Sequence, residues 1–184
     1  CSFCEYTRML CPSKGLQESY VATIEHDVAS FIERYPALRL CGLDVGGETP
    51  TVLCDDAFDR LMDLCRRTMS ISDKSEDFTP SIEATFDTLT EQKIKALVAS
   101  GFKRVSLGVQ STSENVLACN HRKGQETEEM KKTISMLNEN GVDIVNLDMM
   151  YGLNCQTVDS LHQDVQILAY LQPEQVTLYE LRTN

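Results

Sequence analysis

The sequence predicts an α/β fold built on parallel strands, and two observations lead to this prediction. Along the whole chain, apolar residues alternate between the spacing of an amphipathic helix and that of a strand. Five helix-strand units follow one another with short connections. Because strands joined through a helix run parallel with right-handed crossovers, such a series builds either an α/β barrel or an open doubly wound sheet. The periodicity alone does not choose between the two.

The first unit is a helix over residues 16–35 followed by a strand over residues 38–45. Apolar residues recur in the helix at steps of three or four, and Pro36 ends it. The strand is short and apolar, and it runs directly into Gly46 and Gly47. A glycine pair after a buried strand indicates a turn that other residues do not readily adopt.

The remaining four units repeat this alternation. Asp55 and Asp56 suit the start of the second helix, and Thr88 with Glu91 forms a capping-box pattern before the third. The last two helices are expected from Thr127 to a closing Gly141 and over residues 157–171. The strands that complete the units are expected over residues 81–84, 104–110, 142–150 and 175–181.

Length and composition indicate an ordinary globular domain. With 184 residues, of which 42% are hydrophobic and 24% charged, the chain is expected to form one domain over residues 1–184. The net charge of −11 repels nucleic-acid phosphates and anionic lipid, so a small-molecule partner is favoured, with no nucleic acid and no membrane. No run approaches the roughly 18 consecutive apolar residues of a membrane span, and no leader opens the sequence, which predicts a cytoplasmic protein.

The eight cysteines are scattered through a domain large enough to need no disulfides, so most are expected to be reduced thiols. Cys41 and Cys65 lie in apolar periodic segments and are expected to be core residues. Cys1 and Cys4 have the spacing that lets two thiolates reach one metal centre. That spacing alone leaves a 4Fe-4S cluster, a structural role and a redox role all open.

Polar residues stand where the apolar strands stop. In parallel α/β folds these carboxyl ends meet on one face, which is where reactive residues gather. The residues at these ends are Gly46, Gly47, Glu48, Thr49, Pro50, Glu83, Gln110, Asp148 and Glu180. Read singly, each is an ordinary turn or a solvated strand end. Together they predict a functional mouth, and Glu48, Glu83 and Asp148 would also suit the acid-base chemistry of a barrel aldolase or isomerase.

Six segments, taken in order, resemble motifs of the HemN group of the radical S-adenosylmethionine (SAM) superfamily. Cys-Ser-Phe-Cys at residues 1–4 resembles the last two cysteines of a C-x3-C-x2-C loop, whose first cysteine would lie four residues before Cys1. Gly-Gly-Glu-Thr-Pro-Thr at residues 46–51 is similar to the group's Gly-Gly-Gly-Thr-Pro-Thr. The other matching segments are residues 81–84, residues 104–111 (close to RxSxGVQS), residues 120–122 and residues 146–153 (similar to N-x-D-L-I-Y-G-L-P). Asn154 and Cys155 replace the Pro-Gly that usually follows.

This resemblance implies a partial (β/α)6 TIM-like barrel, with the first strand missing from this chain and expected upstream of Cys1. It implies a 4Fe-4S cluster held by Cys1 and Cys4, with S-adenosyl-L-methionine bound beside it. The implied SAM contacts are Gly46, Gly47 and Glu48 at the methionine amine with Thr49 beside them, Arg122 at the carboxylate, Glu83, Gln110 and Asp148 at the ribose, and Phe3 near the adenine.

The activity implied by the resemblance is cleavage of SAM to a 5′-deoxyadenosyl radical. The group's most familiar member, oxygen-independent coproporphyrinogen III oxidase, acts in porphyrin and haem metabolism, so a tetrapyrrole substrate and a flavodoxin or ferredoxin as electron donor are expected. Tyr6 stands where the oxidase carries a further cysteine. A haem chaperone, a haem-degrading enzyme or a radical SAM methyltransferase of the same group therefore stays open, as does a non-catalytic haem-binding protein.

Overall fold

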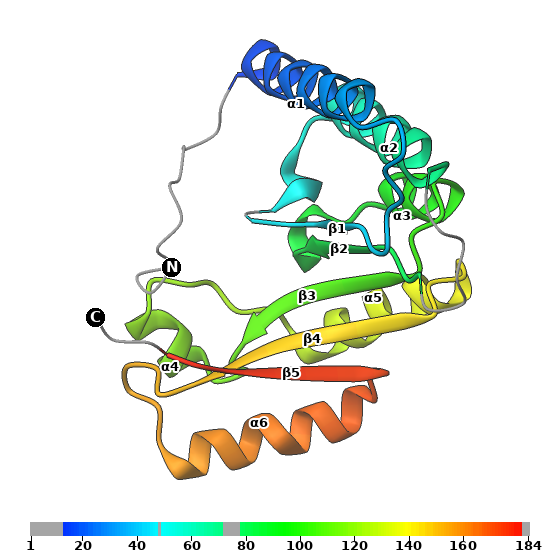
Figure 1. Ribbon diagram of the computed structural model, residues 1–184. Coiled ribbons are helices and arrows are strands. Elements are labelled where there is room, and N and C mark those ends of the chain that lie inside the picture. Colours follow the sequence, from blue (N-terminus) through cyan, green and yellow to red (C-terminus); the bar gives the residue numbers. More distant parts are fainter. Residues whose placement is uncertain (1–12, 48, 72–77, 182–184) are drawn as a thin grey trace.

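The computed structural model describes residues 13–47, 49–71 and 78–181. Within them, five parallel strands form one curved sheet in the order β1-β2-β3-β4-β5 (Figure 1). The strands are β1 (Asp44–Val45), β2 (Ser81–Ala84), β3 (Arg104–Gln110), β4 (Ile144–Tyr151) and β5 (Gln175–Glu180). A doubly wound sheet reverses its strand order partway, whereas here spatial order follows sequence order throughout. The architecture is therefore that of a partial TIM-like barrel, as expected.

Helices connect the strands and cover the outer side of the curve (Figure 1). They are α1 (Lys14–Arg34), α2 (Asp55–Met69), α3 (Glu91–Ala99), α4 (Glu114–Cys119), α5 (Thr127–Glu139) and α6 (Val158–Leu171), with short 3-10 turns η1 (Pro50–Val52) and η2 (Phe86–Thr88). Helices α2 and α5 begin at Asp55 and Thr127, as the sequence predicted, whereas α1 begins at Lys14, two residues before its predicted start. Thr157 caps α6 by accepting a hydrogen bond from the Ser160 N–H at 3.1 Å.

The sheet has one apolar and one polar face, because side chains alternate along each strand. On β3, Val105, Leu107 and Val109 are buried in the hydrophobic core together with residues of α2, α3 and α5. The residues between them face the other way. Register pairs Ser106 with Asn146 and Gly108 with Asp148, and paired residues of parallel strands share a face. The inner face of the curve is therefore lined by polar side chains.

Two local predictions need correction, and one helix was not predicted. The strand expected over residues 38–45 shrinks to Asp44–Val45, because only these two residues pair with β2 while the Leu40 N–H bonds to the Ile71 carbonyl instead. Helix α3 is capped by Thr90, which accepts from the Lys93 N–H at 3.2 Å, and not by Thr88, which lies in η2. Helix α4 was not predicted, since six residues are too few to show a period.

Candidate functional site

The carboxyl ends of the strands bring polar residues from separate units together, and the first contact is between the β1 and β2 ends. The Gly47 N–H donates to Glu83 Oε2 at 3.2 Å. Gly47 has φ +105°, a conformation that favours glycine. A Cβ added at Gly46 would lie 2.5 Å from Glu83 Cδ, which is too close for any real side chain. The glycine pair thus lets a carboxylate approach the backbone directly.

A second contact forms at the end of β3. The Arg122 guanidinium donates through Nη2 to the Gly108 carbonyl. A Cβ added at Gly108 would lie 3.1 Å from Gln110 Nε2 and 3.2 Å from Arg122 Nη2, so both side-chain ends lie close over this glycine. The sheet register shifts between Gly108 and Gln110, and Gln110 has φ +72°. This irregularity re-aims Gln110 at the point where the strand ends.

Asp148 lies in a hydrogen-bonded row across the polar face. The Asn146 amide donates to Asp148 Oδ1 at 2.8 Å and to Ser106 Oγ at 3.2 Å. Thr177 Oγ1 donates to Asn146 Oδ1 at 2.9 Å. Asn146 is fully buried, so its amide is held in one orientation by three partners from three strands. It fixes the Asp148 carboxylate within β4, three residues before the strand ends at Tyr151, and not at the strand end as the sequence predicted.

The carboxylates of this face affect one another. Burial raises the pKa of Glu83 above its usual range, the Gly47 N–H lowers it, and the negative charges of Asp148 and Asp44 add to the rise. Burial also raises the pKa of Asp148, against the hydrogen bond from Asn146 and the positive charge of Arg104. Since Glu83, Asp148 and Asp44 lie on three different strands, the electrostatic interaction between their carboxylates shows that these strands share one polar face. Perturbed carboxyl groups gathered in one place are typical of a functional site.

A pocket of about 280 Å³ opens beside Arg122. Its walls include Thr85, Asp87 and Gly108 from the β2 and β3 ends, together with Arg122 and Gln125 from the segment between α4 and α5. Burial lowers the pKa of Arg122 and the charge of Asp87 raises it, and an arginine side chain stays cationic at neutral pH. The pocket wall therefore carries both the Arg122 guanidinium and the Asp87 carboxylate, together with other hydrogen-bonding groups.

The predicted site residues divide into two groups. The structure brings Gly46, Gly47 and Glu83 together, and Gln110 and Arg122 together, and it links the two groups through Asp148. Thr49 precedes η1 and is half-buried. Cys1, Phe3, Cys4 and Glu48 lie outside the described residues. Within the described ranges, no three His, Cys, Asp or Glu side chains are grouped to hold a metal ion.

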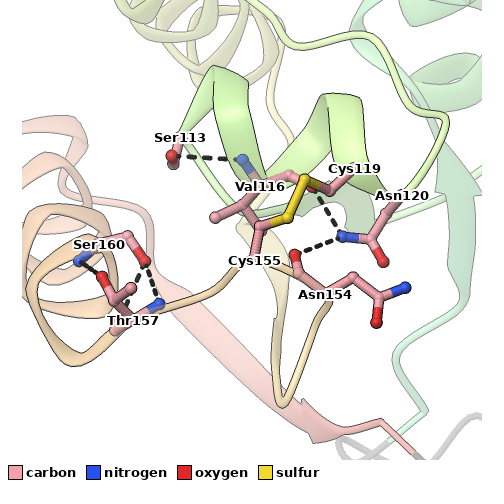
Figure 2. Close-up of a disulfide and its surroundings, with 8 residues drawn as sticks. All are labelled: Ser113, Val116, Cys119, Asn120, Asn154, Cys155, Thr157 and Ser160. Atoms are coloured by element: carbon pink, nitrogen blue, oxygen red, sulfur yellow. Dashed lines mark hydrogen bonds between the residues drawn. A yellow bond between two sulfur atoms is a disulfide. The ribbon is translucent and has the colours of Figure 1, made fainter.

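The cysteines differ from expectation at two points. Cys119 and Cys155 form a disulfide that ties the end of α4 to the loop between β4 and α6 (Figure 2). Cys41 is exposed, because it precedes the residues of β1 that join the sheet, whereas Cys65 is buried as predicted. Cys155 occupies the position that is usually glycine in the resembling motif, and it has φ +63°.

Two side chains that organise the site were missed. Asn146 is a polar residue within an apolar strand, which is a sequence signal for an inward-facing polar row. Asp164 is 1% exposed on α6 and hydrogen-bonds the residues after Gln110. No sequence signal marks Asp164, because its helix also carries other polar residues on exposed positions.

The fold and the site define a class: a singly wound α/β barrel with a polar inner face and a ligand-sized pocket at its carboxyl rim. The family model described as the Radical SAM superfamily matches residues 1–166. The chain therefore belongs to the radical SAM superfamily. None of the helices in the described part of the chain is both long and apolar enough to cross a membrane.

Known proteins narrow the relationship to the HemN-like group. The chain is 27% identical to the haem chaperone HemW of Bacillus subtilis over 98% of its own length and 47% of that protein. It is 29% identical to an anaerobic coproporphyrinogen III oxidase of Cereibacter sphaeroides over 97% of its length and 39% of that protein. The structure of coproporphyrinogen III oxidase HemN from Escherichia coli, described as a radical SAM enzyme, covers 99% of the chain at 26% identity and a TM-score of 0.85, with 41% of that protein aligned. The chain thus spans less than half the length of these relatives.

Proposed function

We propose that this chain is the radical SAM core domain, over residues 1–184, of an enzyme that cleaves SAM and acts on a tetrapyrrole in the manner of oxygen-independent coproporphyrinogen III oxidase. One observation carries the proposal. Glu83 and Asp148 affect each other electrostatically on the polar face, and Gln110 and Arg122 lie together over Gly108, which pairs with Asp148. Of these four residues, which come from distant parts of the sequence, Arg122 also lines the pocket. They are also the residues that the resemblance assigned to SAM.

The described residues fit SAM, which carries an amine, a carboxylate, a ribose and a sulfonium. Arg122 would pair with the carboxylate, since its guanidinium lies in the pocket wall. Glu83, Gln110 and Asp148 would bond the ribose hydroxyls, as a carboxylate or amide oxygen can accept from each. Gly46 and Gly47, with Thr49 beside them, would face the amine through their backbone carbonyls, which can accept hydrogen bonds from an ammonium group.

The first four residues would hold the iron-sulfur part of the site. Cys1 and Cys4 would supply thiolates to a 4Fe-4S cluster, Glu48 would face the methionine amine, and Phe3 would pack near the adenine. When bound and reduced, such a cluster supplies the electron that splits the sulfonium of SAM. The electron would come from a small acidic or iron-sulfur carrier of the flavodoxin or ferredoxin type. The protein would act in the cytoplasm.

The test is anaerobic reconstitution of the full-length protein with iron and sulfide, followed by assay of SAM cleavage with and without coproporphyrinogen III. We expect a brown cluster and 5′-deoxyadenosine, with tetrapyrrole decarboxylation as the coupled reaction. Cys4→Ala should lose the cluster, whereas Asp148→Ala should keep it and weaken SAM binding. A reconstituted protein that holds a cluster but neither binds nor cleaves SAM would end the proposal.

A haem chaperone is the second candidate, and two observations favour it. HemW proteins are among the relatives of similar identity, and Tyr6 replaces the further cysteine of the oxidase motif. In this reading the same rim would bind SAM, while haem would be carried rather than converted. Spectral titration with haem separates the two: tight haem binding without decarboxylation of coproporphyrinogen III supports the chaperone.

A further inference from the structure

A buried carboxylate on α6 lies behind the site and takes no part in the proposed contacts with SAM. Asp164 is 1% exposed, and all its hydrogen bonds in the structure come from one short segment. Ser111 Oγ lies 3.2 and 3.1 Å from its two oxygens. The Thr112 N–H and Thr112 Oγ1 each donate to Asp164 Oδ1 at 2.6 Å. Asp164 is separated from this segment by more than 50 residues of sequence, so the contact joins two units of the barrel.

The segment that Asp164 holds comes directly after Gln110. Gln110 has φ +72° and lies at the register shift of β3. A non-glycine residue in this conformation costs free energy and persists only where its surroundings determine it. Ser111 and Thr112 are the next two residues, and their donors are fixed on Asp164. The carboxylate thus fixes the chain on the far side of the strained residue.

The same contact extends toward Arg122. The Ser113 N–H donates to Ser111 Oγ at 3.2 Å, and Ser113 caps α4. The Arg122 N–H bonds to the Leu117 carbonyl of α4 at 2.9 Å. A continuous series of hydrogen bonds therefore leads from Asp164 through the cap of α4 to the backbone of Arg122. The series connects the segment after Gln110 with the backbone of Arg122, and both side chains lie over Gly108.

We propose that Asp164 is a positioning residue for SAM binding: it holds the turn after β3 so that Gln110 and Arg122 lie together at the rim. This inference rests on the proposed function, in which those two side chains contact SAM. A buried carboxylate is a costly way to fill space, and an apolar residue of the same size would pack as well. What the carboxylate adds is the ability to accept several donors at once, since each oxygen has two lone pairs.

The variants follow from this donor count. Asp164→Leu removes every acceptor while keeping the branched shape and the number of heavy atoms of the side chain. Asp164→Asn keeps one oxygen for the Thr112 N–H and hydroxyl, and its amide can donate to Ser111 Oγ, so it should restore much of the function. Asp159→Asn is the matched control, because Asp159 is exposed on the same helix.

The experiment uses the reconstituted full-length protein and measures SAM affinity, the kinetics of SAM cleavage and hydrogen exchange at the Thr112 amide. For Asp164→Leu we expect the KM for SAM to rise about 10- to 100-fold with kcat nearly unchanged, as lost uniform binding predicts. Thr112 should exchange faster while the core strands keep their protection. Asp164→Asn should fall within about fivefold of the wild type, and the control should not differ from it.

A folded Asp164→Leu protein with wild-type KM would overturn the proposal, and so would a loss confined to kcat. If that variant does not fold, the pair Ser111→Ala and Thr112→Val removes the hydroxyl donors and must raise the KM in the same direction. Failure of the proposed function is distinguishable, because then the wild type itself neither binds nor cleaves SAM. In that case faster exchange at Thr112 in Asp164→Leu would still report whether Asp164 holds the turn.

Discussion

Replacing Gly46 by alanine tests the contact between the β1 and β2 ends. The new Cβ would lie 2.5 Å from Glu83 Cδ and 2.6 Å from its Oε1. Ordinary contact begins at 3.4 Å, so the carboxylate must move by about 0.9 Å, the difference between 3.4 and 2.5 Å. The bond from the Gly47 N–H is already 3.2 Å long and would break.

The loss of a hydrogen bond to a charged group is worth about 1.5–3 kcal/mol, a factor of roughly 10 to 150 in an equilibrium constant. Glu83 is exposed and can turn into solvent, so we expect the lower end of this range in the free energy of unfolding. The weakening of SAM binding should reach the upper end, because the displaced carboxylate leaves its place at the rim.

The assay is urea unfolding together with SAM titration, and Gly42→Ala is the control. Nothing lies within 4 Å of a Cβ added at Gly42, which precedes β1, the strand that Gly46 follows. Gly46→Ala should be destabilised relative to this control and bind SAM more weakly. Equal stability and equal affinity of the two variants would show that the close approach of Glu83 to the backbone does not exist in solution.

Three further predictions concern charge and thiols. Because the pKa of Glu83 is raised above its ordinary 4.5, the folded state holds that proton more tightly than the unfolded state does. The free energy of unfolding of the wild type should therefore fall as pH rises from 4.5 through the raised value. Urea unfolding over a pH series should show that Glu83→Gln lacks this fall, and the same pH dependence in both proteins would contradict the prediction. The Cys119–Cys155 disulfide spans 36 residues, so its reduction by a dithiol should lower the free energy of unfolding of the wild type by about 3–4 kcal/mol. The same treatment should not change the stability of Cys119→Ala. An unchanged number of titratable thiols after reduction would show that the disulfide does not form. Burial raises the pKa of Cys65 to about 11, so in the native protein a thiol reagent should modify exposed Cys41 and leave Cys65 unmodified, as peptide mass mapping can show.

Much of the framework was predictable because it depends on local pattern. The strand ending at Gln110 and the helix after Thr157 were expected where they occur, since period and capping residues are read from neighbours in sequence. The convergence of Glu83 with Asp148 also followed, because parallel strands align their carboxyl ends. These features require no knowledge of side-chain packing.

What was missed depends on tertiary contacts. The 36-residue separation of Cys119 and Cys155 does not by itself indicate a disulfide, because only the fold brings α4 against the loop after β4. The cap of α3 moved to Thr90 because Thr88 is engaged with the Thr51 hydroxyl at 2.5 Å. Asp164 reads as one more polar position of an amphipathic helix until its donors are seen.

The sequential order of the strands has a mechanical consequence. In the described part of the chain, β1 and β5 each have one hydrogen-bonded neighbour, so the curved sheet is an arc with two free ends. A small molecule that binds β2, β3 and β4 together links these strands across the arc, and it stabilises units that otherwise contact only their neighbours. At a concentration 100 times its dissociation constant, such a ligand adds about 2.7 kcal/mol to the free energy of unfolding. Thermal denaturation therefore reports occupancy of the rim without any need for turnover.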